Sequence, residues 1–260
     1  MTEYEAVILD VDGTIIRGET LLPGATDGLR AVDNAGCSRL LFSNNPTRGS
    51  DHYGDKLEPH GIEVRPDRVL TSATVSAAYL VDAHAGERVY LVGGERLKGI
   101  LEGAAVELTN DPEAAEVVLG SFDRTFDYEV LREVFRALAD DVPFYGTDPD
   151  VTVPVDDGAI PGTGAILAAM AAVAGREPDA ILGKPSSVAA SAAMDRLGAE
   201  PERTLVVGDR LDTDIELGVR AGMDTAVVLT GVTDRSTLEA AAIEPTHVLD
   251  SLGDLEALLG

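Results

Sequence analysis

Residues 7–14 carry the segment Val7-Ile8-Leu9-Asp10-Val11-Asp12-Gly13-Thr14, an apolar run that ends in two aspartates and a turn. The branched apolar residues, followed by a Gly-Thr turn signal, predict a buried β-strand. In parallel α/β sheets, ligands bind at the carboxyl ends of strands, so Asp10 and Asp12 are expected where chemistry usually occurs. Two carboxylates this close repel each other, and a cation between them would stabilise both charges. The alternative at this point is an ordinary Asp-Gly turn with solvated carboxylates.

Length and composition indicate a globular chain. The 260 residues predict one large domain or two smaller ones, and the hydrophobic fraction of 45% is ordinary. The chain has a single cysteine, Cys37, which cannot form an intramolecular disulfide. We expect it to be a buried structural thiol. A strand that begins near residue 6 leaves no room for a signal peptide, and the Ala-rich segment 164–175 is too short to cross a bilayer. We therefore expect a soluble cytoplasmic protein.

The net charge of −26 is extreme for this length. Asp and Glu number 46 against 20 Lys and Arg, and the acids are spread along the whole chain. Such a surface repels itself unless salt screens it, so we expect adaptation to a saline cytoplasm, as in a halophile. An acidic partner of a basic protein would concentrate its acids in one region, which this chain does not. The charge also argues against binding to nucleic acid or to an anionic membrane.

Strand and helix patterns alternate along the chain, which predicts an α/β fold with a doubly wound parallel sheet. A second, smaller α/β pattern begins near residue 86, and the turn-rich stretch 152–164 predicts a linker that returns to the first unit. We therefore expect a core formed by residues 1–80 and 179–260, with an inserted domain at residues 81–178. Further core strands are expected at residues 39–42, 68–70, 204–207, 225–229 and 247–249, and strands of the insertion at 88–92, 104–108, 117–119 and 143–145.

Four predicted strand ends carry polar side chains of different kinds. They are Asp10 with Asp12, Ser43, Lys184, and Asp209 with Asp214. Parallel strand ends converge on one crevice, so we expect these groups to lie together. Mg²⁺ binds through a few carboxylates and substrate phosphate oxygens, and a lysine supplies a point charge for phosphate. The set therefore indicates a site for a phosphoryl group.

In these four motifs, taken in order, the chain resembles the haloacid dehalogenase-like (HAD) superfamily. The motifs are Asp10-Val11-Asp12-Gly13-Thr14, then Ser43, then Gly183-Lys184-Pro185, then Gly208-Asp209 with Asp214. Residues 42–46, 161–165 and 229–233 are similar to the NagD-like and 4-nitrophenylphosphatase-like branch, which has a type C2 cap. The resemblance spans nearly the whole chain, and four ordered motifs are far more specific than one. It implies a Rossmann-like core with the inserted domain as a cap.

The resemblance implies a Mg²⁺-dependent phosphatase that works by two phosphoryl transfers. Asp10 would be the nucleophile and would form an aspartyl-phosphate. Asp12 would be the general acid that protonates the leaving alkoxide, and then the base that activates water. Mg²⁺ would be held by Asp10, the backbone carbonyl of Asp12 and Asp209.

The remaining motif residues are implied to bind phosphate or to support the metal. Ser43 and Lys184 would hold the equatorial oxygens as charge shifts between bonds. Asn44 would donate to phosphate or shape the turn after Ser43. Asp214 would support the metal through water or orient Lys184, with a helix N-terminal acid as the alternative.

The cap of this branch is implied to choose the leaving group, so residues at its strand ends are candidate specificity residues. They are Asp123, Arg124 and Asp148. Where relatives resemble Thr-Asn-Pro-Asp, this chain has Asp148 in second place. The extra carboxylate would disfavour a second anionic group on the substrate and would favour a polyol or a cationic group. The alternative is that Asp148 belongs to the generally acidic surface.

The leading functional interpretation is hydrolysis of small phosphate monoesters, such as a sugar phosphate or a nucleotide monophosphate. One alternative is a phosphotransferase or phosphomutase, although superfamily mutases usually carry a cap directly after the first motif. Another is a non-catalytic phosphometabolite-binding protein, against which the presence of both Asp10 and Asp12 argues. A dehalogenase is disfavoured because halide displacement does not require Asp12. The expected partner is a small phosphorylated metabolite. The sequence leaves undecided whether the chain forms a homo-oligomer.

Overall fold

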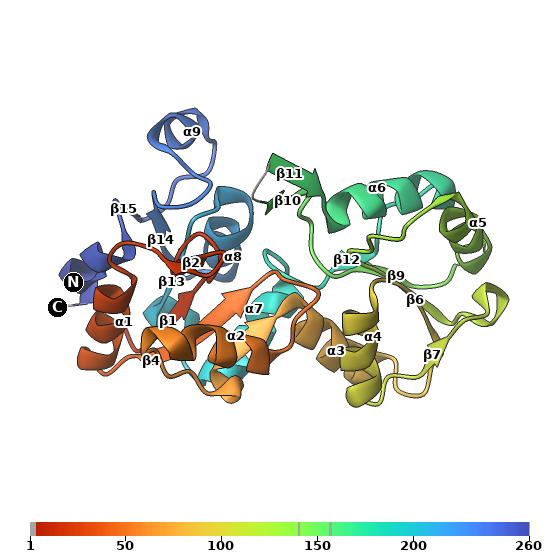
Figure 1. The fold of residues 1–260 in the computed structure, drawn as a ribbon, viewed down its shortest axis with the longest axis horizontal. Coiled ribbons are helices and arrows are strands. Elements are labelled where there is room, and N and C mark those ends of the chain that lie inside the picture. The colour runs from red at the N-terminus through yellow and green to blue at the C-terminus, as the bar shows by residue number, and fades with distance from the viewer. Residues whose placement is uncertain (1–3, 140, 156–157, 260) are drawn as a thin grey trace. The chain divides into compact units, whose positions relative to one another are not determined.

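A computed structural model describes residues 4–139, 141–155 and 158–259 of the chain (Figure 1). The chain divides into two compact units. The first comprises Met1–Ser43, Ser50–Leu70 and Ala189–Gly260, and the second comprises Asn44–Gly49 and Thr71–Val188. The insertion predicted at residues 81–178 falls within the second unit, whose bounds are wider.

The first unit is built on a six-stranded sheet with β1 (Ala6–Leu9) near its centre. β1 runs parallel to both neighbours, so that Ile8 lies beside Val206 on one side and Leu40 on the other. All four β1 residues are buried, which fits a strand that is covered on both faces. The doubly wound α/β prediction is confirmed. The sheet order is β15 (His247–Leu249), β14 (Asp224–Val228), β13 (Thr204–Gly208), β1, β4 (Ser38–Ser43) and β5 (Val69–Thr71).

Helices pack on this sheet through apolar side chains. Val7 and Leu9 of β1 share one buried cluster with Leu29 of α1 (Ala25–Asn34) and with Leu252 near the carboxyl terminus. Gly28 of α1 lets the two segments approach, because a Cβ there would lie 2.3 Å from the Leu252 carbonyl oxygen. The α-helices that begin or lie in this unit are α1 (Ala25–Asn34), α2 (Ser50–Leu57), α8 (Glu216–Ala221), α9 (Arg235–Ala240) and α10 (Glu256–Leu259), and a short hairpin joins β2 (Ile16–Arg17) to β3 (Thr20–Leu21).

The second unit contains a five-stranded parallel sheet with helices on both faces (Figure 1). Side chains alternate along its strands. Val117 and Leu119 therefore pack on the side of α3 (Ser72–Ala83) and α4 (Glu95–Gly103), and Val118 packs on the side of α5 (Tyr128–Ala137) and α6 (Thr163–Ala174). The sheet order is β12 (Ala180–Ile181), β9 (Phe144–Gly146), β8 (Val117–Gly120), β6 (Val89–Val92) and β7 (Leu108–Thr109). The helices are α3 (Ser72–Ala83), α4 (Glu95–Gly103), α5 (Tyr128–Ala137) and α6 (Thr163–Ala174), and α7 (Ser187–Leu197) begins at the end of this unit.

Three sequence expectations differ from the structure. The predicted strand 104–108 begins only at Leu108, because the amides of residues 104–106 close the end of α4 on carbonyls of that helix. The predicted linker 152–164 contains an antiparallel pair, β10 (Thr152–Val155) and β11 (Gly158–Pro161). Cys37 is half-buried, and its thiol donates to the Tyr4 carbonyl (3.2 Å). Within the described residues, no helix has both the length and the apolar character needed to cross a membrane.

Candidate active site

The carboxyl end of β1 presents Asp10 and Asp12 in different surroundings. The Asp10 amide donates to the Val207 carbonyl (2.8 Å), which continues the pairing with β13. The Asp10 carboxylate is buried and accepts a hydrogen bond from Thr14 Oγ1 (3.3 Å). Asp12 is exposed, whereas Val11 between the two aspartates is buried in the core cluster.

Two further carboxylates come from the end of β13 and the π-helical turn Leu211–Ile215 that follows it. Asp209 accepts a hydrogen bond from the Val232 amide (2.7 Å), and Asp214 accepts one from the Arg210 amide (3.1 Å). Both aspartates are only 1% exposed. Asp214 is therefore a buried acid and not part of the solvated surface.

Asp10, Asp209 and Asp214 form a cluster, in which one oxygen of each carboxylate lies within 4.8 Å of the others. Three buried carboxylates at this spacing repel one another, so a bound cation would stabilise all three. An all-oxygen donor set fits a hard divalent cation. Gly13 adopts a φ of +102°, and a Cβ there would lie 2.2 Å from the Asp209 carboxylate, so the chain can pass this cluster only as glycine. The cluster could hold a divalent metal ion.

Ser43, the last residue of β4, lies beside Asp12. Its hydroxyl donates to Asp12 Oδ2 (3.3 Å) and accepts from the Tyr53 hydroxyl (2.7 Å). The Tyr53 hydroxyl also lies 3.1 Å from Asp12 Oδ2, so its single proton is shared between these two acceptors, and Lys56 pairs with Asp12 Oδ1 (3.3 Å). Burial, and next the charge of Asp12, raises the pKa of the Tyr53 hydroxyl well above its ordinary value, so it stays a protonated donor. Sequence reasoning missed Tyr53 and Lys56, although both follow Ser43 on the next helix.

Asn44 and Lys184 belong to the second unit and lie together there. The Asn44 side chain accepts from the Lys184 amide (2.9 Å) and donates to the Lys184 carbonyl (3.0 Å). The Asn44 carbonyl in turn accepts from Ser72 Oγ (2.7 Å). Lys184 is 1% exposed and precedes a cis peptide bond to Pro185. The structure thus clusters three predicted site residues of the first unit, Asp10, Asp209 and Asp214, and places Asp12 in contact with Ser43. In the second unit it brings Asn44 and Lys184 together.

The three candidate cap residues lie beyond β8 and β9. Arg124 is exposed, and Asp123 accepts two hydrogen bonds from Thr125. Asp148 is 2% exposed and accepts hydrogen bonds from the hydroxyls of Thr147 (3.0 Å) and Thr163 (2.7 Å). Burial, and next the charge of Asp150, raises the pKa of Asp148 to about 7. The alternative of a solvated surface acid at position 148 is therefore wrong.

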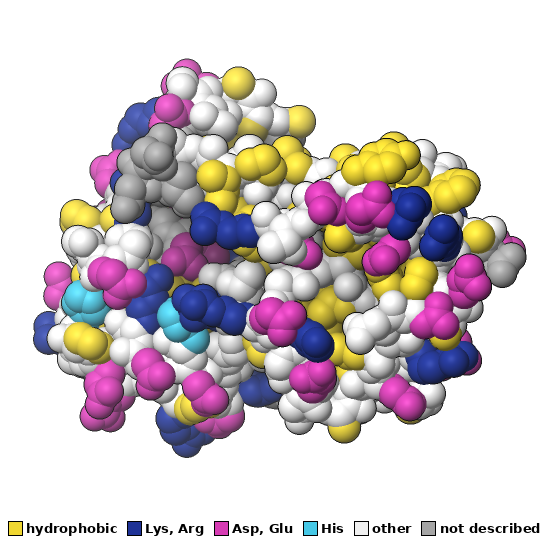
Figure 2. Space-filling model, turned by 45° about the vertical axis from the view of Figure 1, so that its right-hand side comes forward, with side chains coloured by type: hydrophobic (Ala, Val, Ile, Leu, Met, Phe, Trp, Pro, Cys, Tyr) yellow, Lys and Arg dark blue, Asp and Glu magenta, His cyan; other side chains and the backbone are white. Residues whose placement is uncertain are grey.

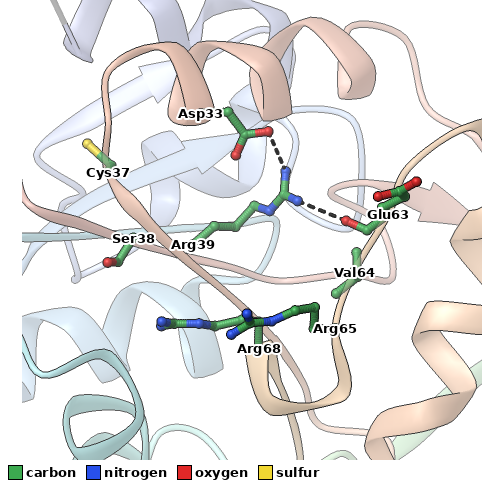
Figure 3. Close-up of a pocket in the computed structure, with 8 residues that line it drawn as sticks. All are labelled: Asp33, Cys37, Ser38, Arg39, Glu63, Val64, Arg65 and Arg68. Atoms are coloured by element: carbon green, nitrogen blue, oxygen red, sulfur yellow. Dashed lines mark hydrogen bonds and ion pairs between the residues drawn. The ribbon is translucent and has the colours of Figure 1, made fainter.

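A surface pocket of about 320 Å³ lies at the start of β4, at the opposite end of that strand from Ser43 (Figure 3). Figure 3 shows the Arg39 guanidinium pointing to the Asp33 carboxylate (3.2 Å) and the Glu63 carbonyl (3.1 Å). None of the three clustered aspartates lines this pocket, so the pocket is separate from the carboxylate cluster. Its lining comprises Asp33, Cys37, Ser38, Arg39, Glu63, Val64, Arg65 and Arg68.

Comparison with known proteins identifies the family. Residues 7–107 match the model of haloacid dehalogenase-like hydrolases, and residues 181–255 match a second model described as HAD-hydrolase-like. An acid sugar phosphatase of Staphylococcus epidermidis is 34% identical over 252 residues, which cover 97% of this chain and 96% of the relative. The chain belongs to the haloacid dehalogenase-like hydrolases.

Other members of this hydrolase family are similar over the same length. A dihydroxyacetone phosphatase of Corynebacterium glutamicum is 33% identical over 255 residues, which cover 98% of this chain and 92% of the relative. The solved p-nitrophenyl phosphatase from Archaeoglobus fulgidus superposes with a TM-score of 0.93 at 32% identity, covering 99% of this chain and 100% of that one. The predicted family and its 4-nitrophenylphosphatase-like branch are confirmed, and the protein is an enzyme of the phosphatase type.

Proposed function

We propose that this HAD hydrolase uses Mg²⁺ to hydrolyse small phosphate monoesters, sugar and triose phosphates among them, through an aspartyl-phosphate on Asp10. The observation that carries the proposal is the buried cluster of Asp10, Asp209 and Asp214 at the ends of β1 and β13. The relatives named acid sugar phosphatase and dihydroxyacetone phosphatase support the substrate class.

Asp10 and Asp12 divide the chemistry between them. An oxygen of Asp10 attacks phosphorus, the bond from phosphorus to the ester oxygen breaks, and Asp12 gives its proton to the departing alkoxide. Asp12 then takes a proton from water, which attacks the aspartyl-phosphate and releases inorganic phosphate. The buried position of Asp10 and the exposed position of Asp12 suit these roles.

The proposed Mg²⁺ donors are the carboxylates of Asp10 and Asp209 and the backbone carbonyl of Asp12, with Asp214 beside them. Mg²⁺, when bound, would offset the repulsion between the Asp10 carboxylate and an anionic phosphate. The proposed phosphate ligands are Ser43, Asn44 and Lys184. Asn44 follows Ser43 directly, and within the second unit its side chain bonds to both backbone polar groups of Lys184.

Substrate choice is assigned by this proposal to the second unit. Asp148 already accepts two threonine hydroxyls, so its carboxylate supports the junction of β9 and α6. Arg124 is exposed after β8, and its cation suits a polar or anionic group of the leaving alcohol. Asp123 lies beside it in the chain and completes the proposed set.

The test is phosphate release from a panel of triose, sugar and nucleotide monophosphates and 4-nitrophenyl phosphate, with Mg²⁺ or with EDTA. Asp10→Asn should lower kcat by at least about a thousandfold on every substrate, because an amide is a poor nucleophile. Asp212→Asn is the matched control, since Asp212 is an exposed acid paired with Arg210 (3.0 Å). Near wild-type kcat in Asp10→Asn with Mg²⁺ present would show that the mechanism is wrong.

A further inference from the structure

The Asp12 side chain is about half exposed, yet both of its carboxylate oxygens contact other side chains. Lys56 Nζ lies 3.3 Å from Oδ1. The Tyr53 hydroxyl donates to Oδ2 (3.1 Å), as does Ser43 Oγ (3.3 Å). A short exposed aspartate ordinarily exchanges between rotamers, and contacts on both oxygens restrict rotation about both side-chain bonds. The orientation of Asp12 is therefore set by its neighbours.

The two outer contacts come from one face of α2. Tyr53 and Lys56 are three positions apart, a spacing that places side chains next to each other on a helix. Tyr53 is fully buried, and the Lys56 side chain is only 11% exposed with its ammonium 5.9 Å from the Tyr53 ring centroid. Burial of both stems fixes the positions of the hydroxyl and the ammonium. Ser50 at the start of α2 donates to the Val69 carbonyl (2.9 Å), which anchors the helix.

The lysine is notable in this chain because only three lysines occur among 260 residues. A salt bridge gains little stability when one partner stays solvated, and the Asp12 carboxylate is about half exposed. A stabilising role alone thus explains the placement of Lys56 poorly. Catalysis, in contrast, depends strongly on placing a reacting group within a fraction of an ångström.

We propose that Tyr53 and Lys56 are positioning residues for Asp12, and that they aim its carboxyl group at the leaving oxygen of the substrate. The inference rests on the proposed role of Asp12 as general acid. Neither residue touches substrate in this proposal, and each acts through the Asp12 carboxylate that it contacts. The consequence is selective, because only leaving groups that need a proton depend on where Asp12 points.

The test compares kcat/KM for two substrates that differ in their leaving group. This parameter reports the steps up to the first irreversible one, which is the loss of the alcohol. Glycerol phosphate releases a strongly basic alkoxide that needs a proton, whereas 4-nitrophenyl phosphate releases a stable phenolate that does not. Lys56→Met and Tyr53→Phe should lower kcat/KM for glycerol phosphate by about tenfold or more and for 4-nitrophenyl phosphate by less than about threefold. Lys56→Arg, which keeps the cation, should recover part of the loss.

Lys98→Met is the matched control, since it removes the same charge from α4, in the second unit. Thermal melting establishes that each variant is folded. Equal losses on both substrates in Lys56→Met and Tyr53→Phe would show a structural role and overturn the inference, as would no loss in either. The Asp12→Asn variant distinguishes failure of the positioning inference from failure of the proposed function. If Asp12→Asn loses glycerol phosphate selectively while the other two variants do not, the acid stands and the positioning inference falls.

Discussion

At the scale of single residues, Asp148 is a buried carboxyl group whose hydrogen-bond donors are neutral. Two threonine hydroxyls and the Asp150 amide (3.2 Å) surround it. Burial opposes the ionised form, and the nearby charge of Asp150 opposes it further, so its pKa rises to about 7. The second unit therefore binds this proton more tightly when folded than when unfolded.

The predicted consequence is a stability that falls as pH rises from the ordinary pKa of 3.8 through about 7. Over this whole interval the free energy of unfolding falls by at most about 4 kcal/mol. Asp148→Asn removes the titration and keeps a group that hydroxyls can both donate to and accept from. Its melting temperature should exceed that of the wild type by a margin that grows between about pH 5 and about pH 8. A margin that is constant over this range would contradict the prediction.

Single residues also show how much of the site could be predicted from the sequence. Asp10, Asp12 and Asp209 were predicted because each follows an apolar run that ends a strand, a local pattern. Tyr53 and Lys56 lie 41 and 44 positions from Asp12, and nothing local marks them as its partners. Their contacts depend on how α2 packs after β4, which is a tertiary property.

At the scale of elements, the loop after β14 shapes the acidic cluster by bringing its backbone against a side chain. A Cβ on Gly231 would lie 1.8 Å from Asp209 Oδ2, which is far inside contact distance. The neighbouring Val232 amide donates to the same oxygen (2.7 Å). The loop therefore fixes the orientation of Asp209, and any side chain at position 231 must displace it.

Gly231→Ala is predicted to raise the Mg²⁺ concentration for half-maximal activity by at least about tenfold, as expected when the support of a metal ligand is disturbed. Gly99→Ala in α4 is the control, because a Cβ there meets no atom within 4 Å. It should leave the Mg²⁺ dependence unchanged and stabilise the protein by up to about 1 kcal/mol. Identical Mg²⁺ titrations for Gly231→Ala and the wild type would refute this account of the loop.

The strands also show which structural features the sequence pattern predicts and which it does not. β1 and β13 were predicted from continuous apolar runs, and both are buried strands. The pair β10 and β11 was predicted as a linker because two prolines and a glycine interrupt the apolar residues. Antiparallel pairing of two short segments depends on their register with each other, which a pattern along one segment does not reveal.

At the scale of the whole molecule, the negative charge is dispersed. On the face shown in Figure 2, Asp and Glu side chains are scattered among Lys, Arg and neutral groups and do not form one continuous patch. Many arginines pair with neighbouring acids, as Arg132 does with Glu129 (2.6 Å) and Arg235 with Asp250 (2.6 Å). Such exposed pairs contribute little each, and they leave the excess of 26 negative charges uncompensated.

This excess predicts that the folded state depends on screening by salt. Repulsion between dispersed carboxylates acts over about 10 Å at 0.1 M salt and over about 3 Å at 1 M, so molar KCl should remove most of it. The melting temperature and the phosphatase activity should both rise from low to molar KCl, and NaCl should act alike because screening depends on ionic strength. At a pH near 4, where many carboxylates are protonated, the same salt series should have a smaller effect. A melting temperature that stays level between low and molar KCl at neutral pH would show that the charge is an incidental feature and not an adaptation to salt.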